Sequence, residues 1–318
     1  MELSAYRVVF FGTPEFAVPV LEALAAHTQV VCVVSQPDRP SGRGCKMCKP
    51  AVKDAAEQLG IEVLQPDTAK GKKFAARIAA YKPDFLVTAA YGRILGRSVL
   101  QVPKKRALNV HASLLPKYRG AAPAAWAVLN GDAQTGVSIM EMVHELDAGP
   151  VYYQQAFDIG EDETAGELLC RLAQTGAAAV VETLRQFDSI TPVPQDHDRA
   201  SYARMLTKQD GLLDWSRNAG ALHDHVRGMA PWPSAFTLFG DVSVKVHASR
   251  LLSAEGTPGG TPGQVLAVDK QGIDVACGTG VLRLLELQAP GKKRMSVQAY
   301  ILGNPIAVGT VLGERGSE

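Results

Sequence analysis

Long apolar runs alternate with amphipathic segments through the first half of the chain. Runs that are apolar on both alternating positions are typical of strands buried on both faces. They predict strands at residues 6–12, 30–34, 61–64, 85–88 and 107–111. Apolar residues at helical spacing predict helices at residues 15–27, 51–60, 71–81 and 163–187. This alternation of strands and helices predicts an α/β fold with a Rossmann-like parallel sheet and right-handed crossovers.

The pattern changes after residue 189. Residues 190–209 are polar, interrupted by prolines and without periodicity, which favours an interdomain linker. One helical segment follows between Trp215 and Met229. Short strands are then predicted at residues 235–239, 242–250, 263–268, 272–277 and 280–287. We therefore expect a Rossmann-like domain over 1–189 and a small OB-like β-barrel domain over 210–318.

Composition narrows the class of protein. A chain of 318 residues usually holds two domains, and an apolar content of 46% can supply both cores. The net charge of +1 gives no global field for nucleic acid, so any such partner needs a local basic patch. No long apolar segment predicts a membrane span, and no secretory signal is visible. Five scattered cysteines fit a reducing cytoplasm better than a disulfide framework.

The candidate chemistry lies at strand ends. Asn109 and His111 end one apolar strand, and alternation along a strand places both side chains on one face. Asp147 is expected to close another strand at residues 146–149. An amide, an imidazole and a carboxylate that converge there could hold an oxyanion and manage one proton. Taken singly, Asn109 and His111 could merely cap a strand, and Asp147 could be a turn residue.

The loops at two strand ends bear on the kind of small-molecule ligand. The first strand–helix turn lacks the G-x-G-x-x-G pattern of dinucleotide sites, and Gly12 alone indicates only a tight turn. Leu114 and Leu115 follow the Asn109–His111 strand directly. Apolar residues at a strand end could wall a flat ring while backbone groups read its edge.

A basic loop runs from Gln36 to Lys53. It contains one acid, Asp38, against the basic residues Arg39, Arg43, Lys46, Lys49 and Lys53. Such a loop favours phosphate contacts, although a solvated surface loop is the alternative. Lys292 and Lys293 begin a second basic cluster, so two basic surfaces could hold one extended polyanion. Cys45 and Cys48 lack a second pair at zinc-ligand spacing, and we interpret them as incidental thiols.

Seven motifs give the chain a resemblance from end to end. They are VFFGTPEF (9–16), SQPDRPSGRG (35–44), YGRIL (91–95), NVHASLLPKYRGAAP (109–123), GVSIMEMVHELDAG (136–149), PWP (231–233) and GKKRMS (291–296). Together they resemble the methionyl-tRNA formyltransferase family, within the superfamily of enzymes that use formyltetrahydrofolate. The loop departs from the family pattern after Gly44, which puts the detailed tRNA contacts of Cys45–Cys48 in doubt.

The resemblance implies a reaction and its residues. It implies transfer of a formyl group from 10-formyltetrahydrofolate, a consumed cosubstrate, to the methionine amino group of initiator methionyl-tRNA, without a metal. It implies a catalytic set of Asn109, His111 and Asp147. The implied folate contacts are Tyr91, Gly92, Ser113, Leu114, Leu115 and Pro116. The implied contacts with the tRNA acceptor arm are Arg39, Arg43, Lys46, Lys49, Lys292 and Lys293.

Three alternatives stay open at this point. The acceptor could be a small amine, such as an amino sugar or a glycinamide nucleotide, or it could be water. The basic loop and the second domain argue against a small acceptor, which needs neither. The chain could also be a non-catalytic RNA-binding module, against which an intact Asn109, His111 and Asp147 set argues. From the sequence we expect a cytoplasmic protein that acts as a monomer and has no membrane partner.

Overall fold

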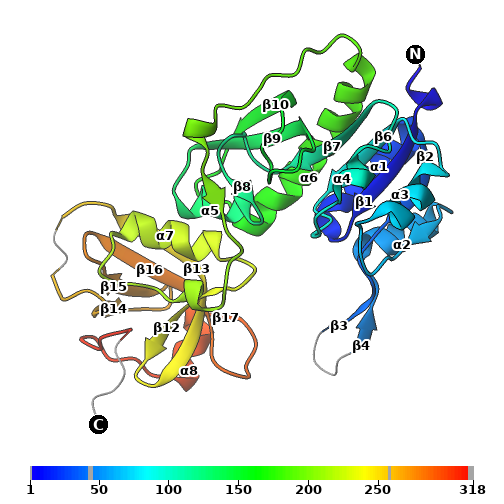
Figure 1. Ribbon diagram of the computed structural model, residues 1–318. Coiled ribbons are helices and arrows are strands. Elements are labelled where there is room, and N and C mark those ends of the chain that lie inside the picture. Colours follow the sequence, from blue (N-terminus) through cyan, green and yellow to red (C-terminus); the bar gives the residue numbers. More distant parts are fainter. Residues whose placement is uncertain (1, 42–45, 257–258, 314–318) are drawn as a thin grey trace. The chain divides into compact units, whose positions relative to one another are not determined.

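The computed structural model describes residues 2–41, 46–256 and 259–313, which form two compact units (Figure 1). Unit 1 comprises Met1–Pro123, Gln134–Asp158 and Leu169–Arg204. Unit 2 comprises Ala124–Ala133, Ile159–Leu168 and Met205–Glu318. Each unit is built around its own β-sheet. Unit 2 thus includes two segments that precede the expected linker, while the domain limits at 189 and 210 stay a prediction.

Five parallel strands form most of the sheet of unit 1, in the order β7-β6-β1-β2-β5. They are β1 (Arg7–Gly12), β2 (Gln29–Val34), β5 (Val63–Leu64), β6 (Phe85–Ala89) and β7 (Arg106–His111). Helices follow the strands, as expected for crossovers. They are η2 (Glu15–Ala17), α1 (Val18–His27), α2 (Ala51–Gln58), α3 (Lys72–Ala79), α4 (Arg97–Leu100) and α6 (Ala165–Gln186). The fold class expected for this half of the chain is confirmed.

The two faces of β7 meet different surroundings, which decides where its polar residues lie. A methyl group added at Gly176 of α6 would approach Val110 Cγ1 to 2.6 Å, so α6 packs closely on the Val110 face. Ala107 belongs instead to the core cluster that contains Val9 of β1, Ile78 of α3 and Val99 of α4. Because side chains alternate along a strand, Asn109 and His111 lie on the Ala107 side, away from α6.

Two antiparallel strands extend this sheet beyond β7, and the sequence analysis did not predict them. They are β9 (Gln134–Glu141) and β10 (Val151–Asp158). In this register Asn109 faces Met140 and His111 faces Ser138. The expectation of a strand at residues 146–149 is wrong, because these residues lie in the loop between β9 and β10. The apolar text of that region belongs to β9, which is buried from Thr135 to Met140.

The segment expected to be a linker makes ordered contacts within unit 1 over its first half. Val193 exchanges two backbone hydrogen bonds with Val151 at the start of β10, each 2.8 Å long. Strand β11 (Tyr202–Ala203) pairs in parallel with β8 (Arg119–Gly120). Gln195 is buried between these two contacts. Residues 193–203 therefore pack on the site strands instead of crossing open solvent.

A short hairpin carries the basic loop of unit 1. It consists of β3 (Arg39–Ser41) and β4 (Lys46–Cys48), and it projects from the sheet as a thin arm (Figure 1). The tip of the hairpin, residues 42–45, lies outside the described residues.

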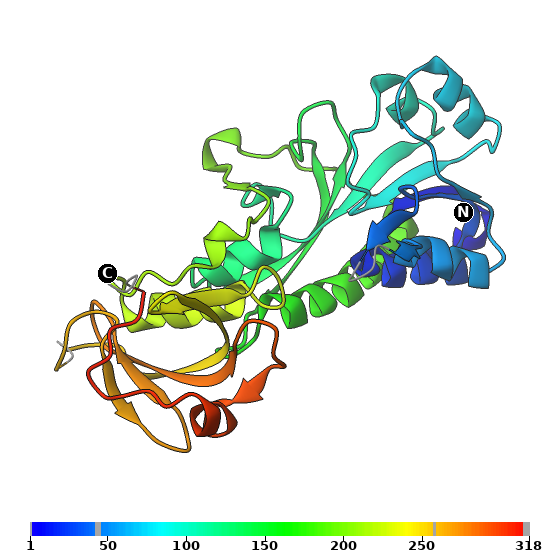
Figure 2. The same cartoon turned by 90° about the horizontal axis from the view of Figure 1, so that it is seen from below.

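Unit 2 contains a curved antiparallel sheet in the order β12-β13-β16-β15-β14, with β17 paired to β16 (Figure 2). The strands are β12 (Ala235–Phe239), β13 (Val242–Ser253), β14 (Val265–Val268), β15 (Ile273–Ala276), β16 (Val281–Gln288) and β17 (Met295–Ser296). The helices of this unit are α5 (Pro123–Leu129), α7 (Ala219–Gly228) and α8 (Val297–Gly303). Three register shifts between β13 and β16 bend the pair, as bulges do. The expected second β domain is confirmed. None of the described helices has the length and apolar content that crossing a bilayer requires.

Candidate active site

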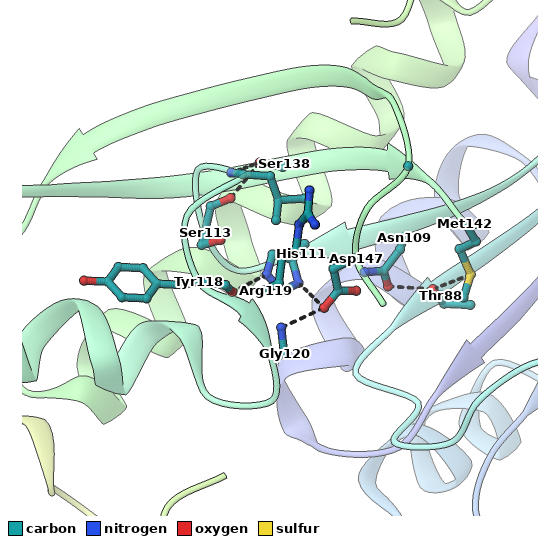
Figure 3. A network of polar contacts seen from close by, with 12 residues as sticks. Thr88, Asn109, His111, Ser113, Tyr118, Arg119, Gly120, Ser138, Met142 and Asp147 are labelled. Atoms are coloured by element: carbon teal, nitrogen blue, oxygen red, sulfur yellow. Dashed lines mark hydrogen bonds and ion pairs between the residues drawn. The ribbon is translucent and has the colours of Figure 1, made fainter. Parts of the chain in front are cut away.

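The sheet register brings the first two candidate residues together at one edge. Thr88 of β6 pairs with Asn109 of β7, and both strands end within two residues of this pair. Thr88 Oγ1 donates to Asn109 Oδ1 over 2.6 Å. The bond fixes the orientation of the amide and turns its Nδ2 donor to the side of His111 and Asp147 (Figure 3).

His111 is buried and contacts polar groups with both ring nitrogens. Its Nε2 lies 2.9 Å from the carbonyl oxygen of Tyr118. A carbonyl can only accept, so Nε2 carries a proton and donates it there. Its Nδ1 lies 3.8 Å from Asp147 Oδ2, within ion-pair range but beyond a hydrogen bond. Nδ1 is therefore the ring nitrogen left to meet a reacting atom.

Asp147 reaches the site from the loop between β9 and β10. The backbone N–H of Gly120 donates to Asp147 Oδ2 over 2.8 Å (Figure 3). Asp147 has a φ of 50°, in the left-handed region that is unfavourable for residues other than glycine. The turn is also tight at Gly149, where a Cβ would lie 1.9 Å from the carbonyl oxygen of Glu141. The loop thus adopts an unfavourable backbone conformation that directs one carboxylate toward His111.

The residues Ser113, Leu114, Leu115 and Pro116 form a loop that is held by hydrogen bonds to Lys117 and to Ser138 of β9. Ser113 Oγ donates to the carbonyl of Lys117, and Ser138 Oγ donates to the carbonyl of Ser113, each over 2.6 Å. The N–H of Leu115 donates to Ser138 Oγ over 3.0 Å. Ser113 and Leu115 are buried, whereas Leu114 and Pro116 are half-buried.

Tyr91 and Gly92 lie at the end of β6, but the tyrosine ring points into the core. It packs edge-on against Phe11 with ring centroids 5.4 Å apart. Burial raises the pKa of Tyr91 above its usual value. The Tyr91 hydroxyl has no hydrogen-bond partner within the described residues. The carbonyl of Tyr91 accepts from Thr13 Oγ1 and Gln36 Nε2, and Gly92 is exposed with a φ of 76°. Only backbone atoms of this pair therefore face the strand ends.

The candidate basic residues are placed unevenly. Arg43 lies outside the described residues, as does the side chain of Lys46. Arg39 is exposed on β3, and Lys49 pairs with Glu57 over 2.6 Å, which raises the pKa of Lys49. In unit 2, Lys292 and Lys293 are both exposed in the turn before β17. Of this set, Lys49 is the residue whose charge is matched locally.

Several residues of the site were not predicted. Thr88 orients Asn109, the carbonyl of Tyr118 holds His111, and the N–H of Gly120 holds Asp147. Gln195 and Arg119 support the Asp147 loop from behind. The only feature of the sequence that pointed to the backbone contacts of residues 117–120 is that they directly follow Ser113–Pro116. Gln195 lies in a segment without periodicity, and no feature of the sequence pointed to it.

The described residues contain no group of three or more His, Cys, Asp or Glu side chains that could hold a metal ion. Cys48 is exposed and Cys45 lies outside the described residues.

Two family models match the chain. One, described as formyl transferase, matches residues 6–184, and one described as formyl transferase, C-terminal domain, matches residues 205–305. Among curated relatives, the methionyl-tRNA formyltransferase of Acetivibrio thermocellus is 45% identical over 97% of this chain and 100% of its own. The methionyl-tRNA formyltransferase of Sorangium cellulosum is 43% identical over 96% of this chain and 99% of its own.

Solved structures share the fold at low identity. An N-formyltransferase from Helicobacter canadensis, in complex with folinic acid and dTDP-3-aminofucose, matches with a TM-score of 0.64 and 16% identity. That match covers 90% of this chain and 100% of the other. HypX from Aquifex aeolicus, in complex with tetrahydrofolic acid, matches with a TM-score of 0.61 and 17% identity. It covers 94% of this chain and 47% of HypX.

We expect Tyr91→Phe to stabilise the protein by about 1 kcal/mol. A buried hydroxyl without a partner has lost its hydrogen bonds to water and has gained none in the protein. For a unit of this size, that gain corresponds to a rise in Tm of about 2–4 °C. Thermal unfolding measures it. The control is Tyr6→Phe, since Tyr6 is a similarly buried residue whose hydroxyl donates to Asp188 over 3.5 Å, so its removal should not raise Tm. A lower Tm for Tyr91→Phe would show that its hydroxyl has a partner after all.

Proposed function

The chain belongs to the formyl transferase family, and we propose that it transfers the formyl group of 10-formyltetrahydrofolate to the methionine amino group of initiator methionyl-tRNA. The observation that carries the proposal is identity of 43–45% over nearly whole chains to relatives named methionyl-tRNA formyltransferase. The geometry of the site is what such a transfer requires.

The reaction joins an amine to a formyl carbon. The neutral amine of the methionyl group attacks the formyl carbon, and a C–N bond forms as the carbonyl oxygen becomes an oxyanion. The bond from that carbon to the folate nitrogen then breaks. The proton lost by the attacking amine balances the proton gained by the departing folate nitrogen.

Asn109, His111 and Asp147 divide this work. Asn109 Nδ2 is directed into the site because Thr88 occupies the oxygen end of the amide. His111 Nδ1 also faces the site, since Tyr118 occupies Nε2. Because Nε2 carries the proton of the neutral ring, Nδ1 can accept the proton of the attacking amine and then donate it. A donor fixed before the reaction, as Asn109 Nδ2 is, stabilises an oxyanion without reorganisation. Asp147 orients the His111 ring through the 3.8 Å contact with Nδ1.

The two substrates meet the site from different surfaces. The apolar wall of Leu114 and Pro116, with the backbone at Gly92, suits the flat ring of the folate. Arg39, Arg43, Lys46 and Lys49 of the hairpin region, and Lys292 and Lys293 of unit 2, supply positive charge for the phosphates of the tRNA acceptor arm. We further propose that the enzyme acts as a monomer in the cytoplasm, where its tRNA substrate is used.

Formyl transfer from 10-formyltetrahydrofolate should require charged initiator tRNA. We expect turnover with methionyl-tRNA, and none with free methionine, uncharged tRNA or a nucleotide-linked amino sugar. Radiolabelled formyl incorporation measures all four acceptors in parallel. Transfer to the amino sugar alone would replace the proposed acceptor by a small amine. Release of formate without any acceptor would indicate hydrolysis instead.

Replacing Asn109 by Ala should lower kcat by about 10²–10³-fold, the usual effect of losing one oxyanion donor. Thr88→Val keeps the amide but removes the hydroxyl that orients it, so a smaller loss is expected. Single-turnover formyl transfer at saturating substrates measures both. A kcat unchanged in Asn109→Ala would remove this residue from the proposed set.

The affinity for tRNA should fall steeply with salt, because each phosphate contact releases counterions. Replacing Lys292 and Lys293 together by Ala should reduce the slope of log K against log[salt] by about 2, one for each lost contact. Filter binding at several salt concentrations measures the slope. Lys72 and Lys73, an exposed pair on α3, provide a control of equal charge that should leave the slope unchanged. Equal slopes for both double variants would exclude Lys292 and Lys293 as contacts.

A further inference from the structure

Gln195 connects the Asp147 loop to a buried arginine. Its side chain is 8% exposed, and its Nε2 lies 2.8 Å from the carbonyl oxygen of Asp147 and 2.7 Å from that of Gly149. Its Oε1 accepts from Arg119 Nη2 over 2.8 Å and from Arg119 Nε over 3.1 Å. Arg119 is itself only 1% exposed.

The chemistry of these four contacts fixes the amide of Gln195 in one orientation. Carbonyl oxygens can only accept and a guanidinium can only donate, so Nε2 must face the loop and Oε1 must face Arg119. Both N–H groups and both acceptor sites of the amide are then occupied. No other side chain of similar size offers two donors on one end and an acceptor on the other except asparagine, which is one methylene shorter.

Arg119 ties this contact to the reacting side chains through its own backbone neighbours. The residue before it, Tyr118, accepts from His111 Nε2, and the residue after it, Gly120, donates to Asp147 Oδ2. Asp147 is thus held at its carboxylate by Gly120 and at its carbonyl by Gln195. Both contacts are therefore made by residues 119 and 120 or depend on them: Gly120 donates directly, and Gln195 is held by the side chain of Arg119.

Asp147 needs such a hold because its own backbone conformation is unfavourable. Its φ of 50° places it in the left-handed region, and the loop has no strand pairing at residues 146–149. Donors to the carbonyls of Asp147 and Gly149 fix the Asp147–Ala148 and Gly149–Pro150 peptide planes. Without them the turn is free to relax, and the carboxylate would move away from His111.

We propose that Gln195 is a positioning residue that acts through Asp147, holding its carboxylate toward His111 without contacting either substrate. The inference rests on the proposed function of Asp147. It adds a supporting residue that lies outside the seven-stranded sheet of unit 1. It also explains why residues 193–203 pack on unit 1: this segment carries the support of the site.

A double-mutant cycle tests the proposal. Gln195→Leu should lower kcat by about 10–100-fold, as loss of an orienting partner commonly does, with KM for both substrates nearly unchanged. In an Asp147→Asn background the same substitution should change kcat by less than about 2-fold, because residues that act through one another are not additive. Gln134→Leu is the control, since Gln134 is exposed and pairs with Asp158 at the far end of β9.

Gln195→Glu separates positioning from packing. A carboxylate of the same shape still accepts from Arg119 but cannot donate to the two carbonyls, so kcat should fall as far as in Gln195→Leu while Tm stays closer to wild type. Wild-type kcat in Gln195→Glu, or an equal loss from Gln195→Leu in both backgrounds, would overturn the proposal.

A second measurement does not depend on turnover. The amide hydrogen of Gly120 should exchange faster in Gln195→Leu, because its acceptor on Asp147 becomes mobile. Unchanged exchange would contradict the proposal. If the wild-type protein transferred no formyl group, the proposed function would fail, while this exchange measurement would still decide whether Gln195 holds Asp147.

Discussion

The site depends on the backbone of residues 118–120. The carbonyl of Tyr118 fixes the ring of His111, and the N–H of Gly120 fixes the carboxylate of Asp147. These two backbone groups belong to the residues on either side of Arg119, so the separation of imidazole and carboxylate is set by the geometry of one short segment. Backbone atoms are better anchors than side chains here, since they carry no rotamer freedom to lose.

That segment is itself anchored by sheet structure from both directions. Strand β8 pairs with β11, and the Ser113–Pro116 loop before it is held by Ser138 of β9. Strand β9 also pairs with β7, where His111 faces Ser138. A single strand thus fixes both His111, the proposed catalytic histidine, and the loop proposed to contact folate. This histidine and the proposed ring wall therefore share one rigid support.

The sequence predicted the parts of this arrangement that depend on local periodicity. Asn109 and His111 could be placed on one face because alternation along a strand needs no knowledge of neighbours. The parallel strands and the second β domain followed from apolar runs and turns. Strand β9 was missed because Thr135, Gly136 and Ser138 interrupt its apolar run, although all three are buried. The Leu146–Gly149 segment that follows suggested a strand where the chain forms a loop. Asp147 was thus expected at a strand end, whereas it lies in a loop that brings its carboxylate to 3.8 Å from His111.

What the sequence could not supply were contacts made by backbone groups and by aperiodic segments. Gln195 reads as linker because polar, proline-rich text carries no burial pattern, yet a glutamine amide is well suited to join loop carbonyls to a buried guanidinium. Charge shows the same limit on the hairpin. Lys49 is one of the basic residues of the loop in the sequence, but in the structure it forms an ion pair with Glu57. Lys53 likewise pairs with Asp38. These two ion pairs offset part of the positive charge that composition assigns to the loop. Lys292 and Lys293 of unit 2, by contrast, are exposed. A count of charges along the sequence cannot separate lysines that face a carboxylate from lysines that face solvent.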